Sequence, residues 1–158
     1  MSNTCPFCSA AIRAALFAEN QYCMAVYNIA PILPGHSMVI PKTHYQSIHE
    51  LPEVELQAFF LFARKITDFL VTYFHGTGFD WSLQEGKEAG QSINHVHLHI
   101  IPRRQGDLES PGAWYRKLQN AQGIEIDQKD REKLDPEKMD TIRHTLRESF
   151  QHFTGKTE

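Results

Sequence analysis

The sequence predicts an α+β fold with a mainly antiparallel sheet. Short apolar segments alternate with turn residues, which is typical of successive strands. Two longer segments, Pro52–Phe74 and Pro136–Phe153, carry apolar residues three and four positions apart, the period of an amphipathic helix. Short strands with helices inserted between them favour an α+β architecture. At 158 residues we expect one domain over residues 1–158, with its core in about residues 1–103.

The first two strands are predicted between residues 22 and 40. Tyr22–Tyr27 has the composition of a strand, and Asn28–Pro34 is a turn-rich connection followed by a glycine. Ser37–Ile40 is predicted as the second strand, and Pro41 is expected to end it.

The segment Pro52–Phe74 is predicted as a long helix. Pro52 suits the first helical position, and Glu53 and Glu55 suit the positive end of the helix dipole. Gly76 is expected to stop the helix. The apolar stripe that would face the core consists of Phe59, Phe62, Ala63, Ile66, Phe69, Leu70 and Tyr73.

Two further strands are predicted after this helix. Alternate residues of Phe79–Leu83 are apolar, the two-residue period of a half-buried strand. A glycine-bearing loop, Glu85–Gly90, leads to the last strand, which we expect at Ile93–Ile101 and which Pro102 would end.

The C-terminal third combines a polar segment with a second helix. Residues 104–134 are polar and charged, and we expect a mobile loop that could drape over a site. Within it, Trp114 and Tyr115 could stack on a base or anchor the loop. Asp135 as N-cap and Pro136 at the first helical position predict a helix over Pro136–Phe153. Its apolar stripe is Met139, Ile142, Leu146, Phe150 and Phe153.

Composition and charge exclude several classes of function. A formal net charge of −3 offers no basic surface for a nucleic-acid polymer, although a single nucleotide remains compatible. The longest fully apolar run, Ala58–Ala63, is too short to span a membrane, and the N-terminal segment lacks the apolar stretch of a secretory signal. Three cysteines do not suggest a disulfide framework. These features predict a cytoplasmic protein.

Three histidines, His95, His97 and His99, are spaced two residues apart. On a strand this spacing places the three rings on one face and apolar residues such as Val96 on the other. Packing alone explains three such rings poorly, because each buried imidazole needs hydrogen-bond partners. The histidines could ligate a metal or supply an imidazole nucleophile. The preceding Gly90-Gln91-Ser92 offers donors for phosphate oxygens, which favours a phosphate-bearing substrate.

The run HVHLHII, residues 95–101, matches the pattern His-φ-His-φ-His-φ-φ, in which φ is apolar. The chain therefore resembles the histidine triad family. Residues 28–36, NIAPILPGH, are similar to that family's nucleotide-binding segment. The stretch FHGTGFDWSLQEGKEAGQSINHVHLHIIPRRQGD resembles the fragile histidine triad branch, the diadenosine triphosphate hydrolases. The resemblance implies a histidine triad fold with a five-stranded sheet, and a homodimer.

The resemblance also implies catalytic roles. His97 would attack the α-phosphorus and form a nucleotidyl-histidine intermediate that water hydrolyses, with a backbone carbonyl fixing its tautomer. His99 and Gln91 would hold the α-phosphate oxygens as charge develops. Gln84 would contact the bridging oxygen or the distal phosphates, and Ser92 would assist the leaving group. Magnesium could accompany the substrate, but the attack itself would need no metal.

A purine nucleotide is the implied ligand. The residues implied to bind it are Val26, Asn28, His36, Met38, Gln84, Gln91 and His99. Val26 and Met38 would form apolar walls against the purine, whereas Asn28 would contact the ribose and His36 the ribose or base. From the residues alone, the two apolar side chains could equally be core, Asn28 a turn residue, His36 an exposed loop residue, and the glutamines polar caps of the sheet.

Cys5 and Cys8 are spaced so that both thiolates can reach one zinc ion. On its own this spacing also fits a redox pair or two free thiols. Similarity to bacterial-type members of the family implies that His44 and His95 complete a structural zinc site. The fragile histidine triad branch differs here, because it lacks the two cysteines. Cys23 lies inside a predicted strand and is expected to be a buried apolar residue.

These observations predict a hydrolase that cleaves dinucleoside polyphosphates, with diadenosine triphosphate giving AMP and ADP. Three alternatives stay open at this point. The first is a nucleoside phosphoramidase or nucleotidyltransferase of the same family. The second is a nucleotide-binding signalling protein in which occupancy matters more than turnover. The third is a metal-dependent hydrolase that uses all three histidines as ligands.

Overall fold

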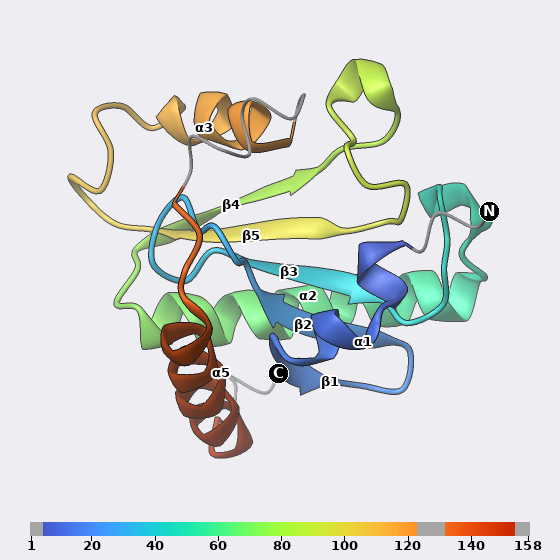
Figure 1. The fold of residues 1–158 in the computed structure, drawn as a ribbon, viewed down its shortest axis with the longest axis horizontal. Coiled ribbons are helices and arrows are strands. Elements are labelled where there is room, and N and C mark those ends of the chain that lie inside the picture. Colours follow the sequence, from blue (N-terminus) through green and yellow to red (C-terminus); the bar gives the residue numbers. More distant parts are fainter. Residues whose placement is uncertain (1–4, 123–131, 154–158) are drawn as a thin grey trace.

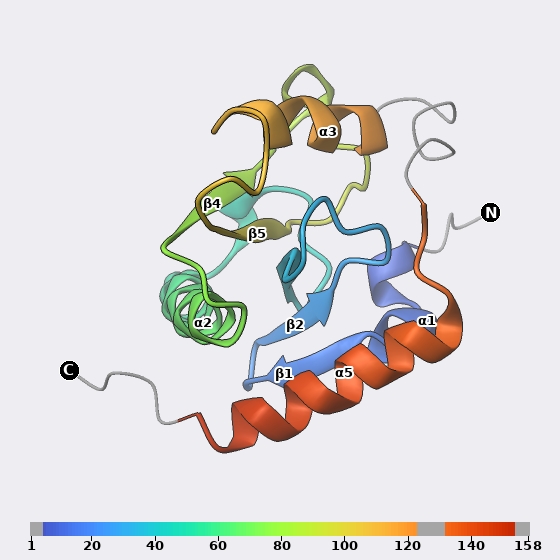
Figure 2. The ribbon, with the colours of Figure 1, turned by 90° about the vertical axis from the view of Figure 1, so that its left-hand side faces the viewer.

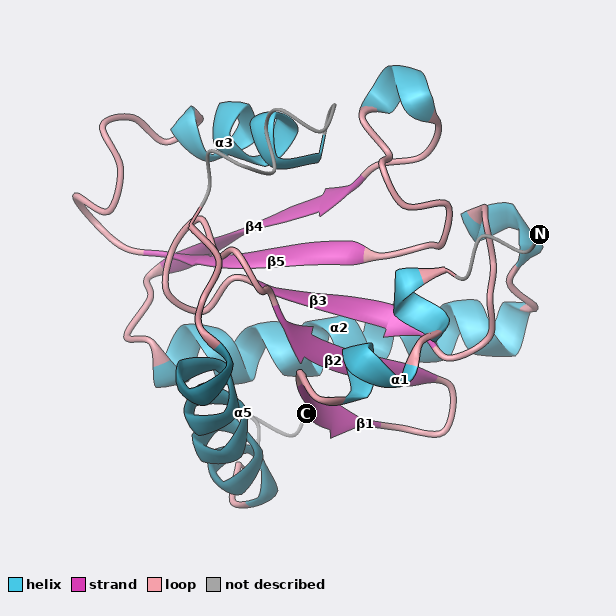
Figure 3. Cartoon of the chain, in the orientation of Figure 1, coloured by secondary structure: helices cyan, strands magenta, loops and turns pink. Residues whose placement is uncertain are grey.

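The computed structural model describes residues 5–122 and 132–153, and a five-stranded sheet forms its centre (Figures 1 and 3). The order across the sheet is β1-β2-β3-β5-β4, and every neighbouring pair is antiparallel. The α+β class and the five-stranded antiparallel sheet are thereby confirmed. The strands are β1 (Leu16–Glu19), β2 (Cys23–Tyr27), β3 (Ser37–Pro41), β4 (Gly78–Leu83) and β5 (Leu98–Arg103).

The N-terminal edge of the sheet contains a strand that the residue pattern did not reveal. β1 has only four residues, three of them buried in succession, so it shows no alternation. It follows a run of alanines and other strong helix formers, which hides it further. Before it lie the short elements η1 (Pro6–Cys8) and α1 (Ala10–Arg13). The next two strands lie where they were expected, although β3 includes Pro41.

The position of β5 differs from the prediction of a strand over Ile93–Ile101. Residues 93–97 bend away from the sheet, and the Val96 N–H donates to the carbonyl of Tyr45 at 2.7 Å. At the other end the strand continues through Pro102, which faces Phe79 of β4. The pairing of β5 with β3 ends at Ile100. Pro102 therefore lies where one side of the strand needs no donor, a position that tolerates proline.

The long helix α2 (Glu53–Tyr73) covers one face of the sheet, whereas α1 lies on the other (Figure 2). Its start differs from expectation, because Pro52 is the N-cap and not the first helical residue. Its end also differs, since His75 and not Gly76 has the left-handed conformation, with φ of 54°. The N–H of Gly76 then closes the helix by donating to Val71 at 2.8 Å.

The C-terminal helix α5 (Pro136–Gln151) is confirmed, two residues shorter than expected. Asp135 caps it, since its carboxylate accepts from the Lys138 N–H at 2.9 Å, and proline begins it. The helix runs beside β1 (Figure 2) and inserts Leu146 into the core.

The segment expected as a mobile loop contains a helix, α3 (Ala113–Gln122), beside β4 (Figure 1). Leu118 is fully buried and Ala113 nearly so. Two buried residues do not form an apolar stripe, so periodicity in the sequence did not predict this helix. Trp114 and Tyr115 both belong to it, the first partly buried and the second exposed. Residues 123–131 of the expected loop lie outside the described residues.

The buried apolar residues form two clusters, one on each face of the sheet. The larger lies between the sheet and α2, with α5 at its edge, and includes Cys23, which confirms the expected burial of that residue. The smaller lies on the opposite face of the sheet and consists of Phe7, Leu16, Met24, Val26, Met38 and Ile40. Within the described part of the chain, no helix is long and apolar enough to cross a membrane.

Candidate active site and metal centre

All three histidines of the triad are buried, but only one lies within a strand. His99 belongs to β5, whereas His95 and His97 lie in the bend just before it. The alternation predicted from the sequence nevertheless holds, because Val96 and the apolar residues that follow pack in the cluster against α2. The rings of His97 and His99 lie edge to face, with centroids 5.0 Å apart. The two rings therefore share the face opposite α2.

The ring of His97 is held in one tautomer. Its Nδ1 lies 2.7 Å from the carbonyl oxygen of His95. A carbonyl only accepts, so Nδ1 carries the proton and Nε2 carries the lone pair. Burial lowers the pKa of His97, which keeps the ring neutral at neutral pH. A neutral imidazole with an oriented Nε2 lone pair is the form that a nucleophile requires.

The orientation of His99 is set through His36. The Ile32 N–H donates to His36 Nδ1 at 3.1 Å, so the neutral ring of His36 has its proton on Nε2. That nitrogen lies 2.9 Å from His99 Nδ1, which must accept. Neutral His99 then carries its proton on Nε2 and is a hydrogen-bond donor there.

His36 is completely buried, so it is not the exposed loop residue that was one interpretation. Its described contacts are with Ile32, Asn28 and His99, and a contact with the ribose or base stays a prediction.

The expected nucleotide walls lie beside these rings. Val26 and Met38 are partners across β2 and β3, and Met38 is also the partner of His99 across β3 and β5. Both belong to the smaller apolar cluster, on the same face as the triad. Asn28 uses its side-chain oxygen in a turn, accepting from the Ala30 N–H at 2.9 Å. Its amide nitrogen points toward His36 and Met38.

Gln84 directly follows β4 and is buried. Ser82 is paired with His99 and Leu83 with Leu98, so Gln84 follows at the level of His97. Among the described residues, neither its amide nitrogen nor its amide oxygen has a hydrogen-bond partner. A buried unsatisfied amide is costly. Its presence next to the triad indicates a place where a polar ligand would complete the bonding.

Gln91 and Ser92 lie in the loop between β4 and β5. The Gln91 side-chain oxygen accepts from the Gly86 N–H at 2.8 Å, and the Gln91 N–H donates to the carbonyl of Gly86 at 3.0 Å. Glu85 fixes the same loop to the segment after β3 by accepting from Ser47 and Ile48, each at 2.8 Å. The Gln91 side-chain oxygen thus helps to close this loop, and the expected phosphate contact of Gln91 stays a prediction. Ser92 is exposed.

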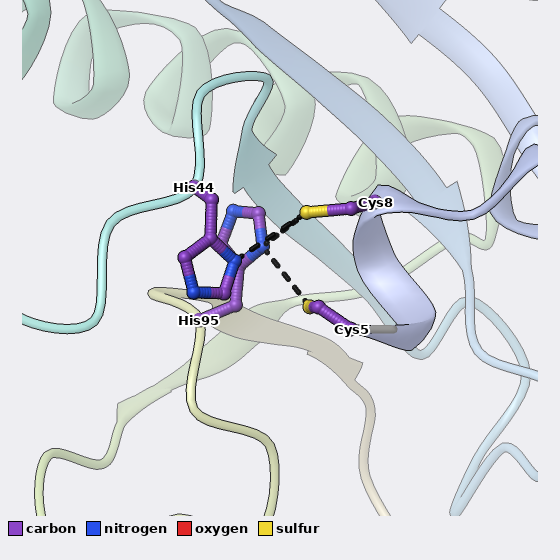
Figure 4. A group of neighbouring side chains, drawn as sticks. All are labelled: Cys5, Cys8, His44 and His95. Atoms are coloured by element: carbon purple, nitrogen blue, oxygen red, sulfur yellow. Dashed lines mark hydrogen bonds between the residues drawn. The ribbon is translucent and has the colours of Figure 1, made fainter. Parts of the chain in front are cut away.

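Cys5, Cys8, His44 and His95 converge on one point (Figure 4). Cys5 Sγ lies 3.4 Å and Cys8 Sγ 3.6 Å from His95 Nδ1, and Cys8 Sγ lies 3.4 Å from His44 Nδ1. Around tetrahedral zinc, with its usual bond lengths, sulfur and nitrogen ligands lie roughly 3.3–3.8 Å apart. These four residues are therefore placed to bind a metal.

His95 is prepared for metal binding by its backbone neighbour. Its Nε2 lies 3.0 Å from the carbonyl oxygen of Pro41, so Nε2 holds the proton and Nδ1 faces the two thiols. Burial is the main cause that lowers the pKa of His95 to about 4, so the ring is neutral. A neutral imidazole and cysteine sulfurs are the donor types that zinc prefers in structural sites.

Comparison with known proteins agrees with this geometry. The model of the HIT domain matches residues 9–106. The chain belongs to the HIT domain family. Among relatives in this family, a bis(5'-adenosyl)-triphosphatase of Dictyostelium discoideum is 32% identical over 145 residues, which cover 92% of this chain and 91% of that protein.

Solved structures of HIT proteins share the fold. A hypothetical histidine triad nucleotide-binding protein from Sulfolobus tokodaii has a TM-score of 0.72 and 24% identity, covering 94% of this chain and 93% of the other. A zinc-bound histidine triad protein from Mycobacterium smegmatis has a TM-score of 0.69 and 25% identity, covering 94% of each chain.

The HIT site includes residues that sequence reasoning did not single out. Phe7 packs edge to face against both His95 and His97. Ile12 and Ile93 are partly buried against the same small cluster as Val26 and Met38. In the sequence, Phe7 is simply a residue between two cysteines. Because the contact spans about 90 positions along the chain, no local pattern indicates it.

Proposed function

We propose that this HIT protein hydrolyses dinucleoside polyphosphates, with diadenosine triphosphate giving AMP and ADP. The observation that carries the proposal is the buried ring of His97, neutral and held through Nδ1 so that Nε2 has the lone pair. The Dictyostelium relative, named bis(5'-adenosyl)-triphosphatase, supports the choice of substrate.

The proposed reaction has two displacements at the α-phosphorus. In the first, the Nε2 lone pair of His97 forms a bond to phosphorus, and the bond to the bridging oxygen breaks with its electron pair leaving on ADP. Nδ1 keeps its proton, so the adenylylated ring is cationic and the His95 carbonyl stabilises it. In the second, water attacks the same phosphorus and the P–N bond breaks. AMP is released, the water proton goes to solvent, and His97 returns to its neutral form.

Two neighbours suit the developing charge. The Nε2–H group that the hydrogen-bond chain assigns to His99 would donate a hydrogen bond to an α-phosphate oxygen. The unsatisfied amide N–H group of Gln84 would donate a hydrogen bond to the bridging or distal phosphate oxygens. Positioning of this kind supplies most of the catalysis of phosphoryl transfer. From the loop that covers Gln84, Gln91 would contact the α-phosphate oxygens and Ser92 would assist the leaving group.

The purine would lie against Val26 and Met38, on the face that carries the triad. The amide nitrogen of Asn28, which contacts His36 and Met38, would reach the ribose. Magnesium would accompany the polyphosphate and would not be held by the triad.

The test is to trap the intermediate. Phosphorus–nitrogen bonds survive alkaline quenching, so the parent protein mixed with diadenosine triphosphate should yield an adenylyl group on the peptide that contains His97. His97→Asn should remove it and lower turnover by roughly 10⁴-fold or more, because no neighbouring group replaces the nucleophile. His144→Asn, an exposed histidine on α5, is the matched control and should behave as the parent.

Hydrolysis in heavy-oxygen water provides a second arm of this experiment. The label should enter AMP, since water attacks the α-phosphorus. Label in ADP, or near-normal turnover by His97→Asn, would contradict the mechanism. If the parent binds the dinucleotide but does not hydrolyse it, the result would instead indicate a nucleotide-binding signalling protein.

We further propose that the metal site holds one structural zinc ion. The donor set of two thiols and two imidazoles supports zinc, as does the zinc-bound relative. When bound, the ion would cross-link the N-terminal segment to the bend before β5. Elemental analysis of the purified protein should find about one zinc per chain, and a Cys5→Ser, Cys8→Ser double variant should lose it. Full stability of metal-free protein would contradict a structural role.

We also propose that the protein is a cytoplasmic homodimer. The free cysteines suit a reducing compartment, where thiolates remain available for zinc. Dimerisation is supported by apolar side chains that α2 and the edge strand β4 leave in solvent, namely Val54, Phe60, Leu61 and Phe79.

A further inference from the structure

Phe7 joins the metal centre to the catalytic histidine. It is the middle residue of η1, in the turn between Cys5 and Cys8, and only 6% of its surface is exposed. Its ring lies 5.1 Å from the ring of His97 at an angle of 71° and 5.9 Å from that of His95 at 68°. Both contacts have the edge-to-face geometry of aromatic pairs.

The hydrogen bond of His97 alone does not fix its ring. A bond from Nδ1 to the His95 carbonyl fixes one atom, and the ring can still rock about that point. The ring of His99 restricts this motion at 5.0 Å. Phe7, at 5.1 Å, is the third restraint. Such rocking moves Nε2, the nucleophilic atom, because this hydrogen bond does not hold it.

We propose that Phe7 is a positioning residue that holds the His97 ring in the orientation for attack, and that the cysteine turn fixes Phe7 against it. This inference rests on the proposed function of His97. The same turn carries Cys5 and Cys8, and His95 both contributes to the metal centre and supplies the carbonyl to His97. The metal centre and the nucleophile are therefore connected by two short routes, one through Phe7 and one through the His95 backbone.

Another role for Phe7 is a wall for the purine, because it packs in the cluster that contains Val26 and Met38. One observation favours positioning: the Phe7 ring contacts two of the three triad histidines edge to face. The two roles predict different kinetics. A wall acts on the binding of the nucleotide, whereas a positioning residue acts on the rate of adenylyl transfer.

The experiment compares Phe7→Leu with Phe17→Leu in the metal-loaded protein. Both remove a buried phenylalanine ring and keep an apolar side chain, but Phe17 packs on the other face, against α2. For Phe7→Leu we expect adenylyl-enzyme formation in a single turnover to slow by roughly 10-fold or more, with KM and zinc content unchanged. Phe17→Leu should lower the melting temperature without changing that rate. Phe7→Tyr, which keeps the ring, should restore most of the rate.

A readout independent of activity follows the Nδ1 proton of His97 by NMR of protein labelled with ¹⁵N-histidine. Phe7→Leu should speed exchange of this proton with water, and Phe17→Leu should not. An increase in KM at an unchanged transfer rate, or equal effects of the two variants, would overturn the proposal. If Phe7→Leu does not fold, Phe7→Met provides the same comparison. If the parent forms no adenylyl-His97, the proposed function fails, and the NMR result still decides whether Phe7 holds the ring.

Discussion

Gln84 is a buried residue whose hydrogen bonds are left incomplete. The loop after β4 closes over it, and a Cβ atom on Gly90 would lie 2.8 Å from the Gln84 amide nitrogen. Gly90 also has φ of 92°, in the region that favours glycine. Two requirements therefore coincide at Gly90, namely its backbone conformation and its close approach to an amide that would serve the substrate.

Gly90→Ala is expected to differ from its control, Gly106→Ala, in its effect on substrate binding. Gly106 also has a left-handed φ, of 75°, but has no atom within 4 Å of an added Cβ. Both alanine variants should lose about 1 kcal/mol of unfolding free energy. Only Gly90→Ala should displace Gln84 and raise KM for diadenosine triphosphate, by roughly 10-fold. Equal KM values for the two variants, measured alongside urea unfolding, would show that Gly90 acts through backbone strain alone.

At the scale of elements, Arg103 connects the end of β5 to its surroundings. Its guanidinium makes two hydrogen bonds of 2.8 Å to Asp107 and one of 2.6 Å to Asp80 on β4. A fourth hydrogen bond, 2.7 Å long, reaches the carbonyl of Pro111, just before α3. The bidentate pair is the strong form of arginine–carboxylate contact. It fixes where the chain leaves the sheet and so where α3 begins.

Removing the Asp107 carboxylate should lower the stability of the protein by an amount that depends on pH. The Arg103 hydrogen bonds, first among several causes, lower the pKa of Asp107 to about 2. The folded state therefore gains stability that is complete above the unfolded value near 3.8 and is lost as pH falls through about 2. Asp107→Asn should lower the unfolding free energy by about 2 kcal/mol at pH 7, and the difference from the parent should vanish toward pH 2.

The matched control for this experiment is Asp140→Asn. Asp140 also contacts an arginine and has a lowered pKa, but its side chain is 68% exposed on α5. Solvent screens such a pair, so no measurable loss of stability is expected. Chemical unfolding of the parent, Asp107→Asn and Asp140→Asn at several pH values measures the change in unfolding free energy of each variant. A difference between the parent and Asp107→Asn that grows below pH 3 would contradict the sign of the prediction.

For the whole molecule, the apolar face over α2 and β4 is the feature that a monomer does not explain. Leu61 and Val54 are each more than half exposed, and Phe60 stacks beside Trp81 near the exposed Phe79. A two-fold axis through such a face would let the same patch cover itself in a dimer. The triad lies on the opposite face of the sheet, so pairing here would leave each site accessible.

Light scattering should give a mass of about twice the 18.2 kDa of one chain, as expected for a closed two-fold assembly. Leu61→Glu should give the mass of one chain, because a carboxylate cannot be buried there without a partner. Ile29→Glu is the control, since Ile29 is similarly exposed and lies in the loop after β2. A parent protein with the mass of a single chain at micromolar concentration would remove the dimer.

Elements with local signals could be predicted from the sequence. Periodicity located α2, α5 and β4 to within about two residues, because burial of one face repeats along a segment. Strand composition and flanking turn residues located β2 and β3 equally well, although these strands are buried on both faces. Alternation also placed the triad histidines on one face, and the run HVHLHII indicated the family. By contrast, only two or three buried residues hold each of β1 and α3 against the rest of the fold. So few buried positions create no periodic pattern in the sequence.

Contacts between side chains far apart in the chain became apparent only in the folded structure. It places the two cysteines within reach of His95, buries His36 beside His99, and brings the Gln91 side-chain oxygen to the Gly86 N–H. It also brought Phe7 against His97. Such contacts depend on strand order, register and the bend before β5. These are set by packing of the whole core and not by preferences that neighbouring residues encode.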